Sequence, residues 1–363
     1  MDKQINKDFQ EHIDIFNQWA MNIDLMRIPI GLYHGKMGLC IYFYELAKLT
    51  SEKKYQLFAE KLLDNVINNI DENIMIDPEN GLTGICMAIN YLLEKKYIAG
   101  NPNYVLKDFD DKIIQSLLFN PIFDIKNTNL STINALLGNL VYLTIRLQNT
   151  KLSKDERHII QGVIIENINK IESYEIEKFT EPTFFSVTEY FTPLYLQLLK
   201  QIYQLHFYDY KIEKIVKGLS SHILYRYPLN KANRLLLCST MSAMNTNLKN
   251  IKGWDEHIDL LQHHIDVTQI IQEFRNKNIS FFNGLSGFYY LLRKTGCYNE
   301  YKNLVFEKIR CSEVWYQLFE NDNTTKASFG LYGGLSGVFL TLMHIMQHSE
   351  LEIFFDHIIN QYV

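Results

Sequence analysis

The stretches "ISFFNGLSGFYYLLRK" (279–294) and "SFGLYGGLSGVFLTLM" (328–343) both spell Gly-Leu-Ser-Gly at the start of an apolar run. A step of small residues before an apolar run recurs at intervals of roughly 50 residues, which is typical of a repeat architecture. The runs are YHGKMGLCIYFYELAKL (33–49), GLTGICMAINYLLEKK (81–96), ALLGNLVYLTIRL (135–147), FTPLYLQLLKQIYQL (191–205), TMSAMNTNL (240–248), GLSGFYYLLRK (284–294) and GLSGVFLTLMHIM (334–346). The first two and last two copies are clear and the middle three are weak, so the sequence predicts seven related units.

Segments between these runs carry charges on one side and apolar residues on the other. In 54–70, Phe58, Leu62, Val66 and Ile70 recur at helical spacing. Similar segments are 155–171 and 301–315. This pattern predicts surface helices, whereas the runs after the glycines are apolar around much more of their circumference and are expected to be covered on several sides.

Each repeat therefore predicts an outer helix, a loop and an inner helix. The expected fold is all-α, an α/α toroid in which a double ring of about seven inner and seven outer helices closes head to tail, in one domain spanning 1–363. An open solenoid of the same hairpins is the alternative. The glycines are expected to let inner helices approach closely and to adopt positive φ in the turns that lead into them.

Composition excludes several classes of protein. The 363 residues are 47% hydrophobic and 13% aromatic, enough for a large core. The net charge is −5 and no block of Lys and Arg stands out, which argues against nucleic acid as a partner. No segment resembles a signal peptide or approaches the roughly 20 apolar residues of a membrane span. We therefore expect a cytoplasmic protein without a membrane span.

The five cysteines are scattered, odd in number and without a CxxC pair, so neither a disulfide framework nor a zinc ribbon is predicted. Most are expected to be buried reduced thiols.

With its ladder of Gly-x-x-Gly steps, the chain resembles the lanthionine synthetase C-like family over most of residues 30–346. The stretch "ENGLTGICMAINYLLEKKYIAGNPNYVLKDFDDKI" is especially similar to the second repeat of its members. The resemblance implies the α/α toroid. It also implies a role in modifying ribosomally made peptides, where family enzymes add a cysteine thiol to a dehydrated serine or threonine. Zinc held by two cysteines and a histidine binds the substrate sulfur as thiolate in those enzymes.

When the family's zinc-binding and catalytic residues are sought one at a time in this chain, most of them are missing. Arg234 and Cys238 in "RLLLCST" stand where the family has an arginine and its first cysteine ligand. Phe282 and Asn283 stand where it has the second cysteine and the histidine ligand. Phenylalanine offers no lone pair, and an asparagine amide is a poor ligand for zinc. The resemblance thus implies Arg234 and Cys238 as catalytic residues and no complete metal site, although Cys238 and Arg234 also fit plain core and ion-pairing roles.

A second group of candidates directly precedes the glycines of three inner helices. Tyr33, His34, Phe282, Asn283 and Tyr332 would face one central cavity in a closed toroid, and form an aromatic and polar rim suited to binding a peptide. Packing within the loops is the alternative reading. Paired carboxylates of a carbohydrate-active enzyme are not indicated, since Glu189 is the acid nearest to an inner-helix start.

Two histidine-rich stretches are weaker candidates. His344 and His348 have the i, i+4 spacing of metal ligands but no third partner in the sequence, and packing or solvent exposure is favoured for them. The segment 257–266 is expected to lie on the surface.

The sequence therefore predicts a family member that binds a ribosomal peptide, or a partner modification enzyme, with no cofactor. The alternative is an active cyclase that forms thioether rings with zinc. The residues present do not decide whether the chain is an enzyme.

Overall fold

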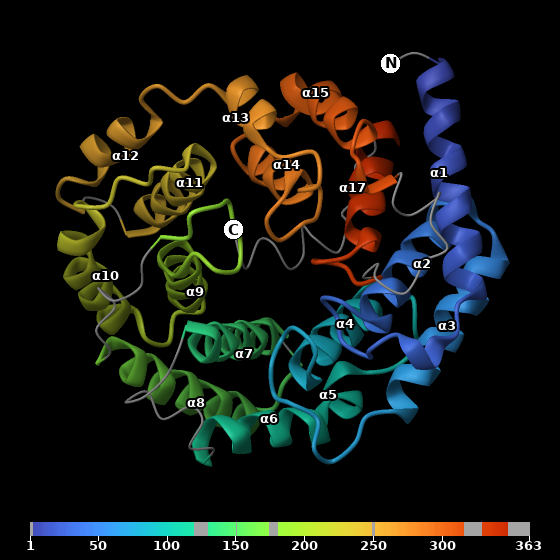
Figure 1. Ribbon diagram of the computed structural model, residues 1–363. Helices are drawn as coiled ribbons and strands as arrows, with labels where there is room; N and C mark the ends of the chain where they lie inside the picture. Colours follow the sequence, from blue (N-terminus) through green and yellow to red (C-terminus); the bar gives the residue numbers. More distant parts are fainter. Residues whose placement is uncertain are drawn as a thin grey trace. The chain divides into compact units, whose positions relative to one another are not determined.

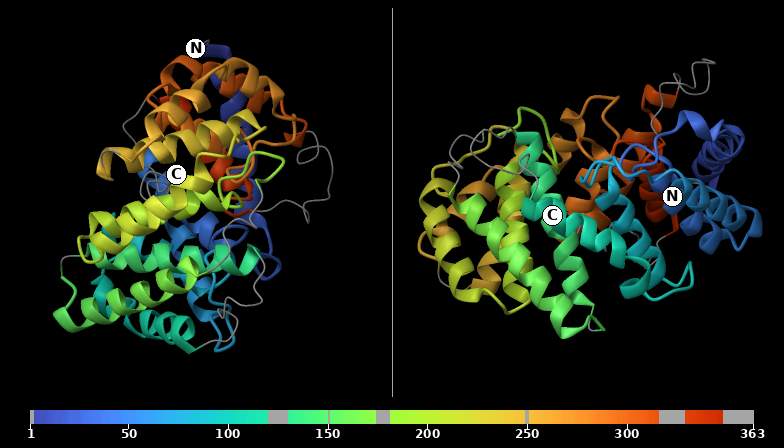
Figure 2. Two further views of the ribbon diagram at one scale, coloured as in Figure 1. Left: turned by 90° about the vertical axis from the view of Figure 1, so that its left-hand side faces the viewer. Right: turned by 90° about the horizontal axis from the view of Figure 1, so that it is seen from below.

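The computed structural model describes residues 3–119, 130–149, 151–173, 181–248, 251–315 and 329–347. Within these ranges the chain consists of α-helices and loops, with one short 3-10 helix, Leu25–Arg27, and no strand (Figures 1 and 2). The helices are α1 Lys3–Asn22, α2 Lys36–Thr50, α3 Lys53–Asn68, α4 Leu82–Glu94, α5 Pro102–Val105, α6 Lys107–Phe119, α7 Leu130–Gln148, α8 Lys154–Glu172, α9 Phe191–Gln204, α10 Asp209–Ile223, α11 Lys231–Leu248, α12 Trp254–Gln262, α13 Val267–Glu273, α14 Leu285–Lys294, α15 Tyr298–Arg310 and α17 Leu335–Gln347. The all-α prediction is confirmed.

The chain divides into two compact units. Unit 1 comprises Met1–Met75, Glu79–Ala88 and Asp266–Asp356, and unit 2 comprises Ile76–Pro78, Ile89–Ile265 and His357–Val363. The boundary runs through α4 after Ala88. The prediction of one domain over 1–363 stays a prediction.

The repeat predicted the apolar helices well. They are α2, α4, α7, α9, α11, α14 and α17, and six of them contain the predicted run with small shifts at the ends. The fifth differs most, because α11 begins at Lys231 and the small step at 240–243 lies inside the helix. Serine and alanine do not break a helix as glycine does, so this step marks no boundary.

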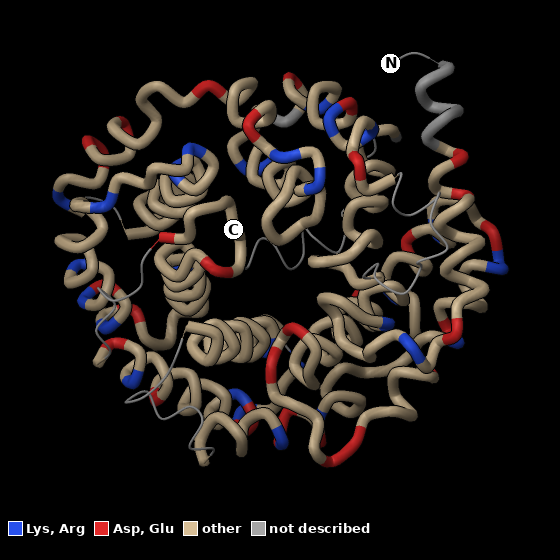
Figure 3. Tube along the Cα trace, viewed as in Figure 1, with Lys and Arg blue, Asp and Glu red and all other residues tan. Residues whose placement is uncertain are grey.

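Five of the seven apolar helices pack against the helix that follows them, in the pairs α2 with α3, α7 with α8, α9 with α10, α11 with α12 and α14 with α15. Neighbouring apolar helices also pack on one another within each unit, as α9 does on α7 and α11 in unit 2. Figure 3 shows many charged residues on α3 and α8 and few on α7 and α9. Burial of the apolar helices explains their composition.

One described helix, α7, is long and apolar enough to cross a membrane, although the sequence analysis expected no such segment. Its most apolar window is 72% buried, and α8 and α9 pack against it. Its apolar character therefore fits a core helix.

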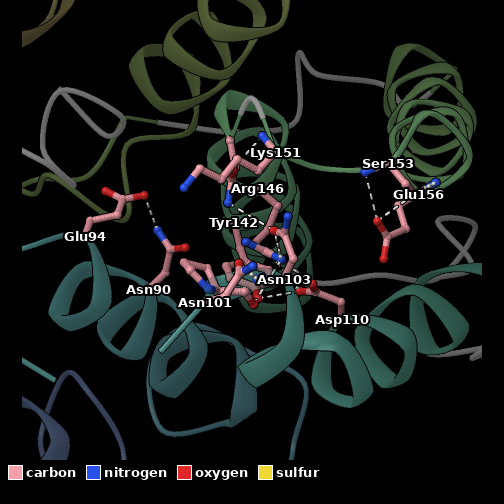
Figure 4. Close-up of polar contacts among 12 residues, drawn as sticks. Asn90, Glu94, Asn101, Asn103, Asp110, Tyr142, Arg146, Lys151, Ser153 and Glu156 are labelled. Carbon is pink, nitrogen blue, oxygen red and sulfur yellow. Dashed lines mark hydrogen bonds and ion pairs between the residues drawn. The ribbon is translucent and has the colours of Figure 1, made fainter. Parts of the chain in front are cut away.

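Polar groups buried in unit 2 are paired where α7 meets α6. Arg146 on α7 forms an ion pair with Asp110 on α6 at 2.9 Å, and the Tyr142 hydroxyl donates to the same carboxylate at 2.5 Å (Figure 4). The Asn103 side chain accepts a further bond from the Arg146 guanidinium at 3.3 Å. A buried charge is costly unless it is paired, so this cluster fixes α7 against α6.

The first and last predicted inner helices meet in unit 1, as the closed ladder requires. Helix α17 packs against α2, and the Leu331 N–H donates to the Leu32 carbonyl at 3.1 Å. These contacts confirm that the first and last of the expected inner helices lie side by side.

Burial contradicts the expectation for one of the two histidine-rich stretches and agrees with packing in the other. His257 is only 6% exposed, and its ring nitrogen Nε2 lies 3.0 Å from the Arg226 carbonyl, so the surface prediction is wrong for this residue. His344 is buried, with Nδ1 3.2 Å from the Tyr289 hydroxyl. His348 lies outside the described residues.

Removing the last repeat tests the closure of unit 1. A chain ending near residue 320 lacks α17, whose buried face covers α2 and α14. We expect loss of cooperative unfolding, because a closed array has no independent cap. Urea unfolding followed by circular dichroism measures this. A truncated chain with a cooperative, native-like transition would argue for an open solenoid.

The acid sensitivity of unit 1 tests the burial of His344. Burial lowers its pKa from 6.5 to about 4, with a smaller contribution from the charge of Arg293. The unfolded chain therefore binds a proton between these values when the folded chain does not, so stability falls as the pH falls through this window. We expect a loss of about 2 kcal/mol between about pH 7 and about pH 5 from this group.

Urea unfolding at the two pH values measures this effect. The pH dependence should shrink by that amount in His344→Leu and remain in His264→Leu, which alters an exposed position. Equal pH dependence in the two variants would contradict a buried, neutral His344.

Candidate functional site

Three loops that precede apolar helices meet in unit 1. We call residues 29–35, 278–284 and 329–334 the entrance loops, since they lead into α2, α14 and α17. The Tyr332 N–H donates to the Tyr33 carbonyl at 3.3 Å, and the Phe282 N–H donates to the Tyr332 carbonyl at 3.1 Å. The last entrance loop therefore bridges the other two through backbone hydrogen bonds.

The Gly-Leu-Ser-Gly sequence explains how each loop is held on its helix. The Ser286 hydroxyl donates to the Ile279 carbonyl at 2.6 Å, and the Ser336 hydroxyl donates to the Phe329 carbonyl at 2.5 Å. Both serines reach seven residues back. The two copies thus build the same closed loop, which fixes the direction of the residues just before the glycines.

The glycines allow backbone to pack on backbone. A Cβ on Gly330 would lie 2.0 Å from the Tyr33 carbonyl oxygen, and one on Gly333 would lie 2.1 Å from the His34 ring. Positive φ is not the reason at the helix starts, because Gly35 and Gly284 have φ of −122° and −135°. The expectation of positive φ is wrong there, and the close approach alone excludes a side chain.

This geometry brings the predicted aromatic rim residues together. The ring centroid of Tyr33 lies 4.7 Å from that of Phe282 and 4.5 Å from that of Tyr332. Phe282 and Tyr332 stack with centroids 5.4 Å apart, and the His34 ring lies 5.8 Å from Phe282. We call these four residues the aromatic cluster.

The four residues of the aromatic cluster differ in solvent exposure. Tyr33 and Tyr332 are each 2% exposed, whereas Phe282 and His34 are half-buried. Burial lowers the pKa of His34, which favours the neutral imidazole. Asn283 is also half-buried, and its Oδ1 accepts a hydrogen bond from the Ser280 hydroxyl at 2.9 Å.

The residues at the implied zinc positions do not fit a zinc site. The Phe282 side chain has no donor atom, and the Asn283 oxygen already accepts from Ser280. Burial raises the pKa of the Cys238 thiol, which disfavours the thiolate that binds metal. The described parts of the chain contain no cluster of three His, Cys, Asp or Glu side chains able to hold a metal ion.

Arg234 and Cys238 lie one turn apart on α11 in unit 2. Cys238 is 2% exposed, and its Sγ lies 4.0 Å from the Ile258 carbonyl of α12. Arg234 donates through Nε to the Pro228 carbonyl at 3.1 Å. The predicted rim residues, by contrast, all belong to unit 1. The catalytic roles of Arg234 and Cys238 stay predictions.

The sequence analysis missed several residues that shape these surroundings. Ser280 and Gly333 hold Asn283 and His34 in place, and Gly333 could have been noticed as the additional glycine of "YGGLSG". Near Arg234 the neighbouring acid is Glu181, whereas Glu189 is exposed. Glu181 precedes α9 by ten residues, and no local pattern singles it out.

Comparisons with known proteins agree with this architecture. The model of the family "Lanthionine synthetase C-like protein" matches residues 28–186. No curated protein matches the sequence. Among solved structures, nisin cyclase aligns with a TM-score of 0.60 and 14% sequence identity, over 99% of this chain and 100% of that chain. The structural match confirms the α/α toroid as the fold.

The family match covers the first repeats, and the structural match continues through the remaining ones. The Gly-x-x-Gly ladder, the paired helices and the joined first and last repeats are consistent with both. Residues 28–186 of this chain are thus similar to the lanthionine synthetase C-like family, and the whole described chain shares the fold of nisin cyclase.

Proposed function

We propose that this protein binds a ribosomally made peptide in a lanthipeptide-type modification pathway, and that it does so without zinc. The aromatic cluster carries this proposal. Its half-buried members, Phe282 and His34, rest on the buried rings of Tyr33 and Tyr332. The match of residues 28–186 to the lanthionine synthetase C-like family supports a peptide as the ligand.

The aromatic cluster is suited to binding because its rings are fixed before a ligand arrives. Backbone hydrogen bonds between the entrance loops hold Tyr332 on both Tyr33 and Phe282. A fixed aromatic surface loses little side-chain entropy when it packs against a ligand ring or aliphatic side chain. Neutral His34 and the Asn283 amide add polar groups at its border. Together they would bind an amphipathic peptide segment.

The donor set supports the zinc-free part of the proposal. In the family, thiolate chemistry depends on ligands that stabilise a bound zinc ion, and Phe282 and Asn283 do not supply such ligands. Binding and positioning a peptide require only the aromatic and polar surface. Binding of a partner modification enzyme through the same surface would also satisfy the residues present, and the experiment below separates the two.

Metal content tests whether zinc is used. Protein purified without added metal should contain zinc well below one ion per chain, because a site with fewer than three protein ligands loses zinc on dialysis. Elemental analysis of the wild type and of Cys238→Ala measures this, and the two should agree. About one zinc ion per chain that survives dialysis and is lost in Cys238→Ala would instead support an active cyclase.

Photocrosslinking tests the ligand of the aromatic cluster. A benzoylphenylalanine at position 282 should capture, in cells of the source organism, a ribosomal peptide that contains Cys and Ser or Thr. The same probe at Tyr210, an 84% exposed residue on α10, is the matched control. Mass spectrometry identifies the adducts. A modification enzyme captured at position 282 would favour the partner-enzyme reading, and identical adducts at both positions would contradict a site at Phe282.

The captured peptide then gives a quantitative test. Phe282→Ala should weaken its binding about fivefold, since an aromatic contact is worth about 1 kcal/mol. Tyr210→Ala should leave the affinity unchanged. Fluorescence anisotropy with the labelled peptide measures both.

A further inference from the structure

Arg234 is a buried arginine whose guanidinium is held in one plane. The residue is 7% exposed, and its Nε donates to the Pro228 carbonyl at 3.1 Å. The guanidinium carbon lies 4.0 Å from the ring centroid of Tyr227, so one face of the group is covered by an aromatic ring. Such stacking fixes the orientation of the terminal nitrogens and leaves their edge available for hydrogen bonds.

No carboxylate forms an ion pair with Arg234 among the residues that the structure describes. Its two terminal nitrogens are not among the fully buried unpaired atoms, so they reach the surface. Arg146 provides the contrast, because it is 1% exposed and is paired with Asp110. An arginine this deeply buried normally has a partner anion, since an unpaired charge is expensive to remove from water.

Glu181 is the nearby acid, and its contacts are with the loops. Its Oε2 accepts a hydrogen bond from the Leu229 N–H at 3.3 Å, and its Oε1 is buried without a hydrogen-bond partner among the described residues. Burial raises its pKa, and the charge of Arg234 opposes this only in part. Glu181 therefore ties the loop before α9 to the loop before α11, and the terminal nitrogens of Arg234 remain open.

Exposed apolar side chains lie on the two segments whose backbone carbonyls contact Arg234 and its neighbour Asn233. Tyr225 and Leu229, in the loop that carries Tyr227, are 91% and 88% exposed. Phe184 is 42% exposed, and its carbonyl accepts a hydrogen bond from Asn233, the neighbour of Arg234, at 3.0 Å. These three residues and Tyr227 form what we call the Arg234 rim. A cation at the centre of an apolar surface matches a carboxylate next to an apolar side chain.

We infer that Arg234 and its rim form a binding site for a peptide carboxylate that is flanked by a large apolar side chain. The inference rests on the proposed function and names the feature of the peptide that unit 2 recognises. The open edge of the guanidinium would accept the carboxylate through two parallel N–H···O bonds, and the rim would cover the adjacent apolar side chain. An aspartate or glutamate side chain and a C-terminal carboxylate share this chemistry.

Three short probes separate the sources of the carboxylate. They are acetyl-Leu-Asp-Phe-amide, its neutral analogue acetyl-Leu-Asn-Phe-amide, and acetyl-Leu-Asn-Phe with a free C-terminal acid. Binding is followed through the Nε–H signals of protein labelled with nitrogen-15 at arginine. A carboxylate probe should shift the Arg234 signal and bind at least tenfold more tightly than the neutral one, as expected for a charge-assisted pair. The probe that does so identifies the source.

Variants test that the preference arises at Arg234. Arg234→Gln should abolish it, and Arg234→Lys should retain only part of it, because lysine keeps the charge but lacks the planar pair of donors. Arg275→Gln, which removes the same charge from an exposed position in unit 1, should keep it in full. If Arg234→Gln does not fold, the Arg234 signal of the wild type and the lysine variant carry the test. Equal binding of all three probes, or equal loss in Arg234→Gln and Arg275→Gln, would overturn the inference.

The outcome is independent of the test at Phe282. A carboxylate preference at Arg234 without a peptide captured at position 282 would leave this site standing and remove the aromatic cluster from the proposed function. A captured peptide without a carboxylate preference would do the reverse.

Discussion

Backbone packed directly on backbone at the start of α2 is the contact on which unit 1 depends. A Cβ on Gly38 would lie 2.4 Å from the Leu331 nitrogen, and one on Gly330 would lie 2.0 Å from the Tyr33 carbonyl oxygen. No L-side chain fits in these gaps. The hydrogen bond between Leu331 and Leu32 forms because both glycines leave room for it. These glycines thus let Leu32 and Leu331, which lie far apart in the sequence, come into contact.

The same contact creates the aromatic cluster. Once the loops before α2 and α17 share hydrogen bonds, the residues just before their glycines are neighbours, and the loop before α14 joins them through Tyr332. Tyrosine and phenylalanine at these positions fill the space with stacked rings. Cysteine and histidine there would offer metal ligands. The fold and the chemistry are therefore separable, since the serines and glycines build the loop whatever residue precedes them.

The two buried arginines of unit 2 differ in whether a carboxylate pairs with them, and this difference distinguishes a structural arginine from a candidate binding residue. Arg146 is neutralised by Asp110 and joined by Tyr142 and Asn103, as expected of a group that stabilises the packing of two helices. One face of the Arg234 guanidinium is covered by the Tyr227 ring, and its terminal nitrogens form no ion pair with a described residue. Fixing a charge at the border of the protein in this way costs stability, which is typical of a site that receives its partner anion from a ligand.

The helical repeat follows from the sequence alone, because glycine spacing and one-sided apolar patterns are local properties. The sequence also predicted that Tyr33, His34, Phe282 and Tyr332 lie close together, since equivalent positions of neighbouring repeats occupy equivalent positions in the fold. It did not show that α11 begins at Lys231, that His257 is buried, or that no carboxylate among the described residues forms an ion pair with Arg234. These depend on which loops and helices pack on one another. Burial and ion pairing involve residues that are distant in the chain, so they become visible once the helices and loops are packed.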